Sequence, residues 1–547
     1  MLTKRIGLLV LALVTAMGLA ACSNGNNGGN AEPQTATNSV ETGSNEGAEK
    51  VNPTGFPIVN ETLDVTFFTG LAPIAATDWS QVKLWQEYEK MTNIKVKFDL
   101  VPRASLSEKR NLALAGGEYP EAFYQALIPN GDILKYGEQG IFVRLNEYID
   151  NFAPNFKQIL DSNPAVRKAI TMPDGGIYSF PWIFDPAFTS LTMGPRVWIN
   201  KDWLDQLGMQ EPTTLDEFYS YLKGVKETDL NGNGKSDEIP WSAVGLQQII
   251  ASLKGSYGFA NRGNSHPLVD VEPGTDQLRF FPADPKYKEM LEFIHMLYKE
   301  GLIDRDTLTQ KTPDMYAKGN QNLLGTTITV NPRITMKLEN YVGAGALKGP
   351  HGDQIYSFVN PSVPLIGGFV ITDKAKNVEA LVRWIDYFYG EEGSRMLMIG
   401  FKDVTYKELP DGKFELLDNI TNNPDGLSQD QALSKYVTYP GGGAPTIVFQ
   451  NNYAGGEAQP DSLMTAEKVQ PYKIDEVWPT FNFTEEENDR MTKLRSDLYT
   501  YVNEHEAKFI LGDLPFSQWD KFVAGLKDVK LDEFMEIYNT AYERYKQ

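Results

Sequence analysis

Apolar and polar residues alternate along the start of the main body of the chain in the way that strands and helices require. Residues 63–67 and 94–100 alternate with a period of two, as half-buried strands do. Between them, apolar residues recur at helical spacing over 82–91. A second helix over 107–116 leads into an apolar run at 122–127, which suits a buried strand. This βαβαβ order predicts an α/β lobe with a mainly parallel sheet.

The same kinds of element return later in the chain. The pattern predicts strands over 197–199, 323–330 and 368–372, and helices that begin at Lys201 and after Thr214, cover 378–389 and close the chain over 534–545. Thr214 and Glu217 have the spacing of a capping box, in which each side chain bonds a free backbone N–H of the other residue. The sequence contains no internal repeat. Its 547 residues are enough for two such lobes.

The first residues have the pattern of an export signal. Lys4 and Arg5 precede an uncharged apolar run over 6–19, which is shorter than the ~20 residues that a membrane-spanning helix needs. Leu19–Cys22 resembles the lipobox of bacterial lipoproteins, in which the cysteine is acylated and becomes the mature N-terminus. The sequence therefore predicts a signal peptide at 1–21 and lipidation of Cys22. The alternative is an ordinary signal peptide with a chance cysteine.

Residues 22–57 differ in composition from everything that follows. They are rich in Asn, Gly, Ser, Thr and Glu and contain no aromatic residue before Phe56. Such a segment cannot bury enough apolar surface to offset its loss of conformational entropy. We expect the lipidated cysteine to be followed by a flexible linker up to residue 57.

Composition excludes several classes of function. The chain has 51 Lys and Arg against 72 Asp and Glu, a net charge of −21, and no basic stripe, so nucleic acid is excluded as a partner. An acidic membrane surface would repel the protein equally, so we expect the lipid anchor to be what attaches it to the membrane. The single cysteine excludes a disulfide framework, an Fe–S cluster and a cysteine-based zinc site.

One short segment has the pattern of a calcium-binding loop. Oxygen-bearing side chains stand at positions 1, 3, 5 and 9 of this loop: Asp229, Asn231, Asn233 and Asp237. Gly234 occupies the sixth position, where an EF-hand loop turns sharply, and Lys235 would offer its carbonyl oxygen. The twelfth residue is Pro240, which has no carboxylate, so Glu238 is the candidate for closing the shell. We expect a structural calcium ion here; the alternative is an Asx-rich turn without metal.

Several motifs occur in the order typical of one bacterial family. They are Gly116–Glu121, Gly140–Asn146, Pro173–Pro181, Ile199–Gly208, Asp229–Pro240, Gly301–Asp304 and Phe369–Thr372. Together they resemble the family 1 extracellular solute-binding proteins, in the lipoprotein branch that includes LipO-like and alginate-oligosaccharide-binding proteins. Asp237 and Glu238 also match the calcium-site pattern of the alginate-binding relatives.

The resemblance implies an α/β, two-lobed periplasmic-binding-protein-like fold of type II. Each lobe would be a mainly parallel sheet flanked by helices, joined to the other by hinge strands around a ligand cleft. On this basis we expect an N-terminal lobe over 58–188 plus 362–405. The C-terminal lobe would then cover 189–361 plus 406–547.

Sugar recognition needs flat apolar rings for the C–H face of the sugar and planar polar groups for its hydroxyls. By analogy with the alginate-binding relatives, several loops would face the cleft, and they supply seven candidates for ligand binding: Trp79, Trp182, Trp241, Asn331, Arg333, Phe449 and Gln450. Each could instead be a packing residue, and Trp241 more readily than the others. Four further tryptophans fall on periodic helix or strand faces and are expected in the core: Trp85, Trp198, Trp203 and Trp384.

These observations predict a monomeric receptor, lipid-anchored on the outer face of the cell membrane, with no catalytic residues. The family resemblance implies that it captures a carbohydrate, an oligosaccharide, between its lobes and delivers it to the permease subunits of an ABC transporter. Closure of two lobes on a ligand is an established motion of such receptors. The alternatives are an exported polysaccharide-degrading enzyme (a glycoside hydrolase or lyase) and a surface sensor or adhesin of the same fold.

Overall fold

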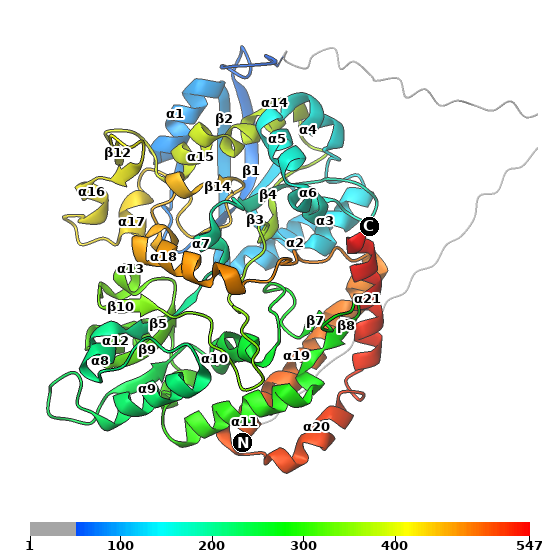
Figure 1. Cartoon of the computed structure of the whole chain (residues 1–547). Helices are drawn as coiled ribbons and strands as arrows, with labels where there is room; N and C mark the ends of the chain where they lie inside the picture. Colours follow the sequence, from blue (N-terminus) through cyan, green and yellow to red (C-terminus); the bar gives the residue numbers. More distant parts are fainter. Residues whose placement is uncertain (1–50) are drawn as a thin grey trace, which may run out of the picture. The chain divides into compact units, whose positions relative to one another are not determined.

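Two separate sheets organise the chain. The structure is a computed structural model and describes residues 51–547 (Figure 1). The first sheet has six strands in the order β14-β4-β11-β3-β1-β2, and the second has four in the order β10-β5-β9-β6. Helices flank both sheets, as the predicted α/β class requires.

The first sheet begins with the predicted βαβαβ unit. β1 (Leu63–Leu71) pairs in parallel with both β2 (Ile94–Pro102) and β3 (Ala122–Ile128). The connections run through α1 (Lys83–Thr92) and α2 (Leu106–Gly116). The other three strands of this sheet come from later segments of the chain. β11 (Leu365–Ile371) lies antiparallel between β3 and β4 (Phe180–Phe184), and β14 (Ile447–Val448) runs parallel to β4 at the edge.

The second sheet differs from the predicted mainly parallel arrangement. β5 (Arg196–Asn200) is antiparallel to both of its neighbours, β10 (Tyr341–Gly343) and β9 (Leu324–Thr329). Only β9 and β6 (Ile239–Ser242) run parallel. Two short hairpins lie outside the sheets: β7 (Val269–Val271) with β8 (Leu278–Phe280), and β12 (Tyr406–Glu408) with β13 (Phe414–Leu416). The prediction of a parallel sheet was therefore wrong for this lobe.

The remaining helices cover the sheets and connect them. They are α3 (Asn130–Glu138), α4 (Asn146–Phe152), α5 (Pro154–Ser162), α6 (Pro164–Ile170), α7 (Thr189–Thr192), α8 (Lys201–Gln206), α9 (Leu215–Glu227), α10 (Leu246–Leu253), α11 (Pro285–Lys299), α12 (Thr312–Asn320), α13 (Pro332–Met336), α14 (Val378–Asp386), α15 (Glu391–Met398), α16 (Asp418–Thr421), α17 (Gln429–Leu433), α18 (Pro460–Val469), α19 (Glu485–Leu511), α20 (Trp519–Gly525) and α21 (Leu531–Lys546). The capping box predicted at Thr214 and Glu217 is present at the start of α9.

Two hydrophobic cores correspond to the two sheets. The first draws its buried residues from 58–191 and 363–448, and the second from 193–359 and 466–542. The chain therefore passes between the cores three times, near residues 192, 361 and 457. The assignment of 406–448 to the second lobe was wrong, because Tyr406, Ile420 and Val448 are all buried in the first core.

The predicted linker also ends earlier than expected. Val51 pairs with Val59, and the Arg383 guanidinium donates to the carbonyl oxygens of Asn52 and Gly55. Residues 51–57 are thus bound to α14 and the first core rather than forming linker. The predicted signal peptide, Cys22 and the rest of the linker lie outside the described residues.

Stacked aromatic rings fill the centre of the first core. Trp384 on α14 lies parallel to Trp85 on α1, with ring centroids 5.6 Å apart, and meets Phe67 of β1 edge-on at 5.2 Å. Trp85, Trp198, Trp203 and Trp384 are all buried, as predicted. These rings join the first helix of the chain to a helix some 300 positions later, as Trp85 and Trp384 show.

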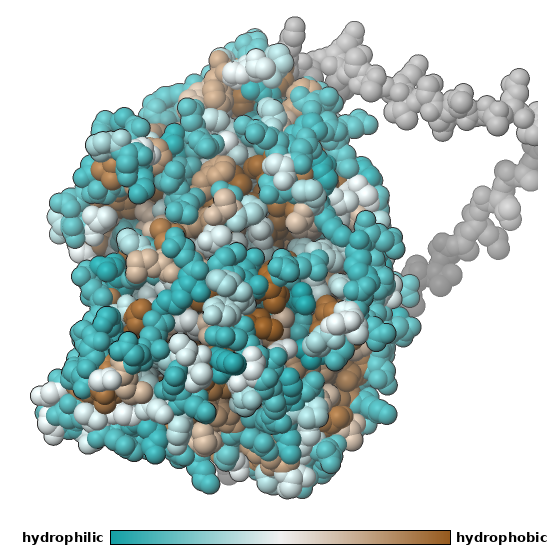
Figure 2. Space-filling view, viewed as in Figure 1, coloured by the Kyte–Doolittle hydropathy of each residue, from teal (hydrophilic) through white to brown (hydrophobic). Residues whose placement is uncertain are grey.

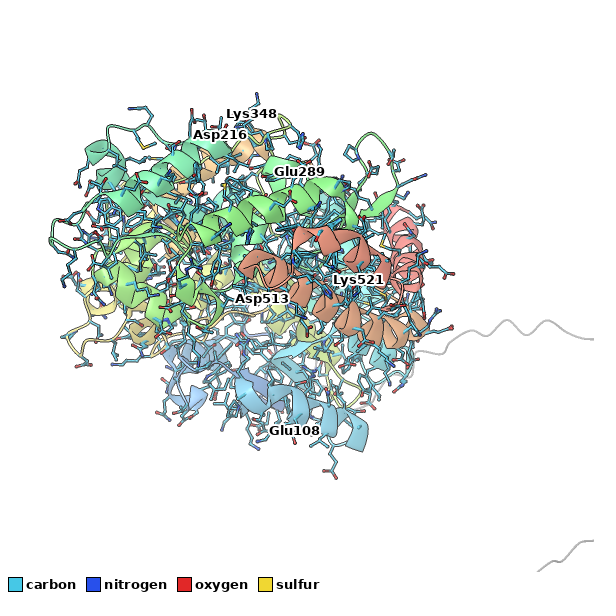
Figure 3. The ribbon with its side chains drawn as sticks, turned by 90° about the horizontal axis from the view of Figure 1, so that it is seen from below. Glu108, Asp216, Glu289, Lys348, Asp513 and Lys521 are labelled. Atoms are coloured by element: carbon cyan, nitrogen blue, oxygen red, sulfur yellow. The ribbon has the colours of Figure 1, made fainter. Side chains whose placement is uncertain are left out.

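The face shown in Figure 2 is mostly hydrophilic, with hydrophobic residues exposed in small groups. In the view from below, charged residues such as Glu289 on α11 and Asp513 after α19 lie at the surface (Figure 3). Among residues 51–547, no helix combines the length and the apolar character that crossing a bilayer requires.

Candidate functional site

A run of three glycines lies against one edge of the first sheet, where β1 and β3 end and β4 passes. Gly441, Gly442 and Gly443 all have positive φ angles, of 103°, 73° and 85°. A Cβ on Gly441 would lie 2.2 Å from the Cβ of Ala72, so no other residue fits at this position. The glycines therefore allow the loop to approach the sheet edge closely.

Strand β3 is irregular at the same edge. Gln125 and Leu127 have φ angles of 52° and 50°, and the pairing of β3 with β11 shifts register between Gly367 and Phe369. Non-glycine residues with positive φ are uncommon and concentrate at functional sites, where the surroundings hold them in place. Here the Arg110 guanidinium donates to the carbonyls of Ala126 and Leu127, at 3.0 and 2.8 Å.

Trp182 and Arg103 lie beside the glycine loop. Trp182 is half-buried in β4 against Phe184, and the position of a Cβ on Gly442 is 3.4 Å from its ring. Its indole Nε1 is buried and has no hydrogen-bond partner within residues 51–547. Arg103 Nη2 donates to the carbonyl of Gly442 at 3.3 Å, and burial lowers the pKa of this guanidinium. Trp79, Trp85, Trp241 and Trp478 also have a buried Nε1 without a partner among the described residues, so the position of Trp182 beside the glycine loop, and not this N–H alone, makes it a candidate contact.

A pocket of about 390 Å³ adjoins this loop and is lined by residues of α13, α17 and the end of α15. Its volume lies within the range of small-molecule sites. The residues that line it are Val330, Ile334, Thr335, Met398, Ile399, Ser428, Gln429, Asp430, Leu433, Tyr439, Pro440, Gly441, Tyr453, Ala454, Gly455, Gly456 and Glu457. Since residues 330–335 follow β9 of the second sheet and α15 and α17 pack on the first core, the two lobes build this pocket together.

Two tyrosines form the aromatic part of the pocket. Tyr439 and Tyr453 meet edge to face with ring centroids 6.3 Å apart, and Tyr453 donates its hydroxyl to Glu457 at 2.8 Å. Burial raises the pKa of both phenols, so both hydroxyls stay protonated at neutral pH. The pocket thus combines aromatic rings with polar groups that can pair with ligand hydroxyls.

Three of the seven predicted ligand-binding residues are packing residues instead. Trp79 and Trp241 are 1% and 0% exposed, with their rings against Phe98 and Phe218. Asn331 is 0% exposed; its side chain caps α13 and donates to Asp461 and Ser462 in the segment around α18. Because these side chains are enclosed by protein, the prediction that they contact ligand was wrong.

The other candidates lie nearer the site but do not line the pocket. Arg333 on α13 pairs with Glu339 at 2.6 Å, Phe449 packs partly against the first core, and Gln450 is exposed in a short turn. Trp182 is the candidate that the structure places beside the glycine loop. Asp430, Tyr439 and Glu457 were missed. The run Gly441–Gly443 was the sequence signal for this region, since consecutive glycines mark a close backbone approach.

The predicted calcium loop is closed by bonds among its own residues. Asp229 accepts from the backbone N–H groups of Asn233 and Gly234, at 3.1 and 2.8 Å. The amides of Asn231 and Asn233 both donate to Asp237 at 3.0 Å. Lys235 N donates to Asn233 Oδ1 at 2.8 Å, so its backbone lies inside the turn. Gly232 and Gly234 supply the positive φ angles that the turn needs.

Glu238 is the residue of this loop with an unused oxygen. Its Oε1 accepts from the N–H groups of Leu230 and Asn231, at 2.8 and 3.2 Å, whereas its Oε2 is buried without a partner among the described residues. Across residues 51–547 there is no group of three or more His, Cys, Asp or Glu arranged to hold a metal. The loop's donor set mixes carboxylates with asparagine oxygens, and such hard oxygen donors suit Ca²⁺.

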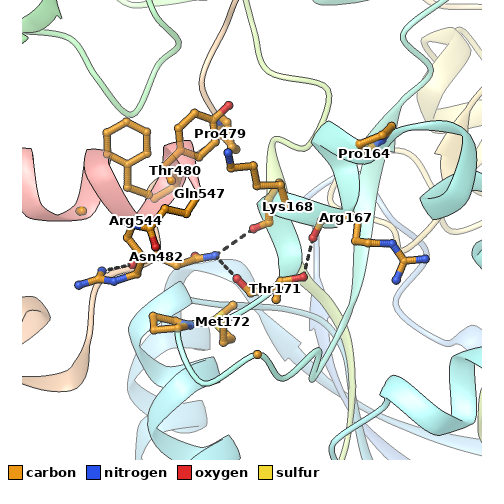
Figure 4. A pocket seen from close by; sticks show the side chains of 16 residues that line it. Pro164, Arg167, Lys168, Thr171, Met172, Pro479, Thr480, Asn482, Arg544 and Gln547 are labelled. Atoms are coloured by element: carbon orange, nitrogen blue, oxygen red, sulfur yellow. Dashed lines mark hydrogen bonds between the residues drawn. The ribbon is translucent and has the colours of Figure 1, made fainter. Parts of the chain in front are cut away.

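A second groove, of about 400 Å³, lies where the C-terminal helix meets α6 (Figure 4). Asn482 donates to the carbonyls of Ala169 and Thr171, at 3.1 and 3.0 Å, and accepts from Asn130 at 2.8 Å. Lys168 lies over the ring of Tyr545 at 4.4 Å. This groove is therefore a place where the second lobe is bonded to the first, away from the glycine loop.

Two bacterial proteins of known identity match most of the chain. The chain is 28% identical over 507 residues to the fructooligosaccharide ABC transporter substrate-binding protein FusA of Streptococcus pneumoniae, covering 90% of this chain and 92% of FusA. It is 25% identical over 485 residues to lipoprotein LipO of Bacillus subtilis, covering 84% and 88% of the two chains.

Solved structures show the same fold. FusA in complex with kestose superposes with a TM-score of 0.73 at 25% identity, over 88% of this chain and 99% of FusA. An EF-hand mutant of FusA has been solved with fructo-nystose. The calcium-free form of the alginate-binding protein AlgQ2 matches in fold alone, with a TM-score of 0.70 at 21% identity, over 89% and 99% of the chains.

The family model for bacterial extracellular solute-binding proteins matches residues 75–395. This match covers more than half of the chain and confirms both the resemblance seen in the sequence motifs and the two-lobed α/β fold class. The chain belongs to the family of bacterial extracellular solute-binding proteins.

Proposed function

We propose that this protein is a receptor that captures an oligosaccharide between its two lobes and delivers it intact to an ABC importer. The observation that carries the proposal is the pocket that both lobes build beside the Gly441–Gly443 loop. Support also comes from FusA, which was solved with a bound trisaccharide, kestose.

The chemistry of the site suits a sugar. Tyrosine and tryptophan rings offer flat faces to the C–H groups of a pyranose or furanose, and Trp182 Nε1 offers a donor without an acceptor. Asp430, Glu457 and Gln429 supply planar acceptors and donors for hydroxyl groups. Ligand must bind the closed arrangement of the lobes more tightly than the open one, because only that difference in affinity shifts their positions.

We also propose that the receptor is tethered to the outer face of the membrane through lipid on Cys22 and works as a monomer. The basic, apolar and small-residue pattern before Cys22 supports this proposal. An acidic chain that must remain near a permease gains a high local concentration from such a tether.

Binding without turnover is the expected outcome of a ligand screen. Purified protein should show a raised melting temperature with at least one neutral oligosaccharide of three or four units, since a ligand that binds only the folded state stabilises it. The same samples should return the sugar unhydrolysed on chromatography. Release of shorter products would contradict the receptor function and favour the exported enzyme. A stabilising sugar together with no uptake defect in a strain lacking this protein would favour the sensor.

We propose that the Asp229–Glu238 loop holds a structural calcium ion. Asp229, Asn231, Asn233, Asp237 and Glu238 would supply side-chain oxygens, and Lys235 its carbonyl. The partnerless Glu238 Oε2 supports this assignment, because a bound cation would satisfy it. An ion there would neutralise three neighbouring carboxylates and fix the turn between α9 and β6.

Removal of calcium should lower the melting temperature. At a calcium concentration 100 times the Kd, the bound ion raises the free energy of unfolding by about 2.7 kcal/mol, and removing the ion lowers it by the same amount. Chelation and Asp229→Ala should each produce this loss, and added calcium should rescue the wild type alone. Asp411→Ala is the matched control, because Asp411 also closes an exposed turn by accepting from a backbone N–H. Calorimetry that detects no calcium-dependent stabilisation would remove the assignment.

A further inference from the structure

The charged residues that line the inter-lobe pocket all have the same sign. Among the residues that line it in the described chain, the ones with a formal charge at neutral pH are Asp430 and Glu457, and both are acidic. From this lining, we propose that the pocket selects uncharged saccharides and rejects those that carry carboxylates, such as uronate oligomers. This inference rests on the proposed function and names its substrate class.

Two cations near the pocket, Arg333 and Lys435, are already paired with carboxylates. Arg333 stands between the lining residues Val330 and Ile334 in sequence, but its guanidinium faces Glu339 at 2.6 Å and Asp461 at 3.7 Å. Lys435, just beyond α17, pairs with Asp425 at 3.3 Å. An anionic sugar in the pocket would therefore meet two carboxylates and no Lys or Arg among the lining residues.

Arg103 is the cation that could reverse this selectivity. Its Nη2 donates to the carbonyl of Gly442, on the loop whose other side faces the pocket through Tyr439 and Gly441. No carboxylate within 4 Å pairs with it in the described residues. The Gly442 contact places Arg103 behind the loop, so it is the residue to test as the rival explanation for any anion binding.

The acidic lining also explains how a neutral sugar would be held. A carboxylate accepts hydrogen bonds from two vicinal hydroxyls, and charge-assisted bonds of this kind are about twice as strong as neutral ones. Asp430 lies in the first turn of α17, where burial raises the pKa of its carboxyl above the ordinary value. Glu457 is fixed by the hydroxyl of Tyr453 at 2.8 Å. Both groups are thus oriented acceptors beside aromatic rings.

Calorimetric titration with two matched sets of sugars tests the inference. One set is uncharged (kestose, nystose, maltotriose) and the other anionic (trigalacturonate and an alginate trisaccharide). We expect at least one uncharged sugar to bind at least tenfold more tightly than either anionic one at low ionic strength. The discrimination should shrink as salt screens the charges.

Substitutions assign the discrimination to the pocket. Asp430→Asn combined with Glu457→Gln should weaken the binding of the neutral sugar and reduce the difference in affinity between the neutral and the anionic sugars. Asp411→Asn is the matched control: it removes an exposed carboxylate outside the pocket and should change nothing. Unchanged thermal unfolding would show that each variant is folded.

The outcomes separate the two levels of the proposal. Equal or tighter binding of an anionic sugar would overturn the selectivity while leaving the receptor function intact. If Arg103→Gln then abolished that binding, Arg103 would be the charged contact. If the double variant still binds uncharged sugars more tightly than anionic ones by the same factor, the two carboxylates of the pocket are not the cause of the selectivity. Binding by no sugar of either set would contradict the proposed function itself.

Discussion

Trp182→Ala should weaken oligosaccharide binding by about 30- to 700-fold. A buried aromatic residue at the centre of an interface typically contributes about 2–4 kcal/mol, and each 1.4 kcal/mol changes Kd tenfold. Trp182 is half-buried beside the glycine loop and carries a buried Nε1 that no residue of 51–547 accepts from. Calorimetric titration with the tightest sugar of the screen measures the change.

Trp182→Phe separates the two roles of this side chain. Phenylalanine keeps an aromatic face but has no N–H, so we expect a smaller loss, of about tenfold, for one missing hydrogen bond. Trp519, a buried tryptophan in the second core, provides a control for general damage: Trp519→Phe should leave sugar affinity unchanged. Wild-type affinity in folded Trp182→Ala protein would show that Trp182 does not contact the ligand.

Trp384→Ala should cost about 3–5 kcal/mol of the free energy of unfolding, the usual range for deleting a large buried aromatic side chain. Trp384 is 1% exposed and packs against Trp85, Phe67 and Phe369. Its loss opens a cavity at the point where α1, β1 and α14 meet, and these elements come from distant parts of the chain. Denaturant unfolding, followed by circular dichroism, measures the change.

Tyr472→Ala is the contrasting control, because that ring is among the exposed large hydrophobic residues and should cost less than about 1 kcal/mol. Two cores can unfold in separate steps, and the Trp384 substitution should shift the step that belongs to the first core. A loss below about 1 kcal/mol for Trp384→Ala would contradict its place at the centre of that core.

The part of the fold that local pattern determines was predictable. Strands β1, β2 and β3 and the helices between them follow directly from period-two and helical spacing, and they pair as expected. The antiparallel neighbours of β5 were not predictable, since pairing between strands more than 100 residues apart leaves no trace in either strand alone. The lobe boundary at 405 failed for a similar reason: β14 has two residues and gives no strand signal.

The candidate site was less predictable than the fold. A loop tryptophan can turn toward a ligand or into the core with the same sequence around it, and Trp79 and Trp241 turn inward. The pattern around Asn331 is that of a polar loop, but its side-chain amide donates hydrogen bonds to Asp461 and Ser462 across the connection between the lobes. No sequence pattern identified Asp430 or Tyr439 as site residues, because their role depends on α13 packing opposite them from the other lobe.

Titration of the wild-type protein with the tightest neutral oligosaccharide, followed by recovery of that sugar, shows whether the protein is a receptor. We expect one sugar bound per chain with saturable heat, and full recovery of the same sugar at its original length after the protein is denatured. Recovery of cleaved sugar, or the absence of saturable binding to any saccharide, would contradict a receptor that holds its ligand between two lobes and releases it unchanged.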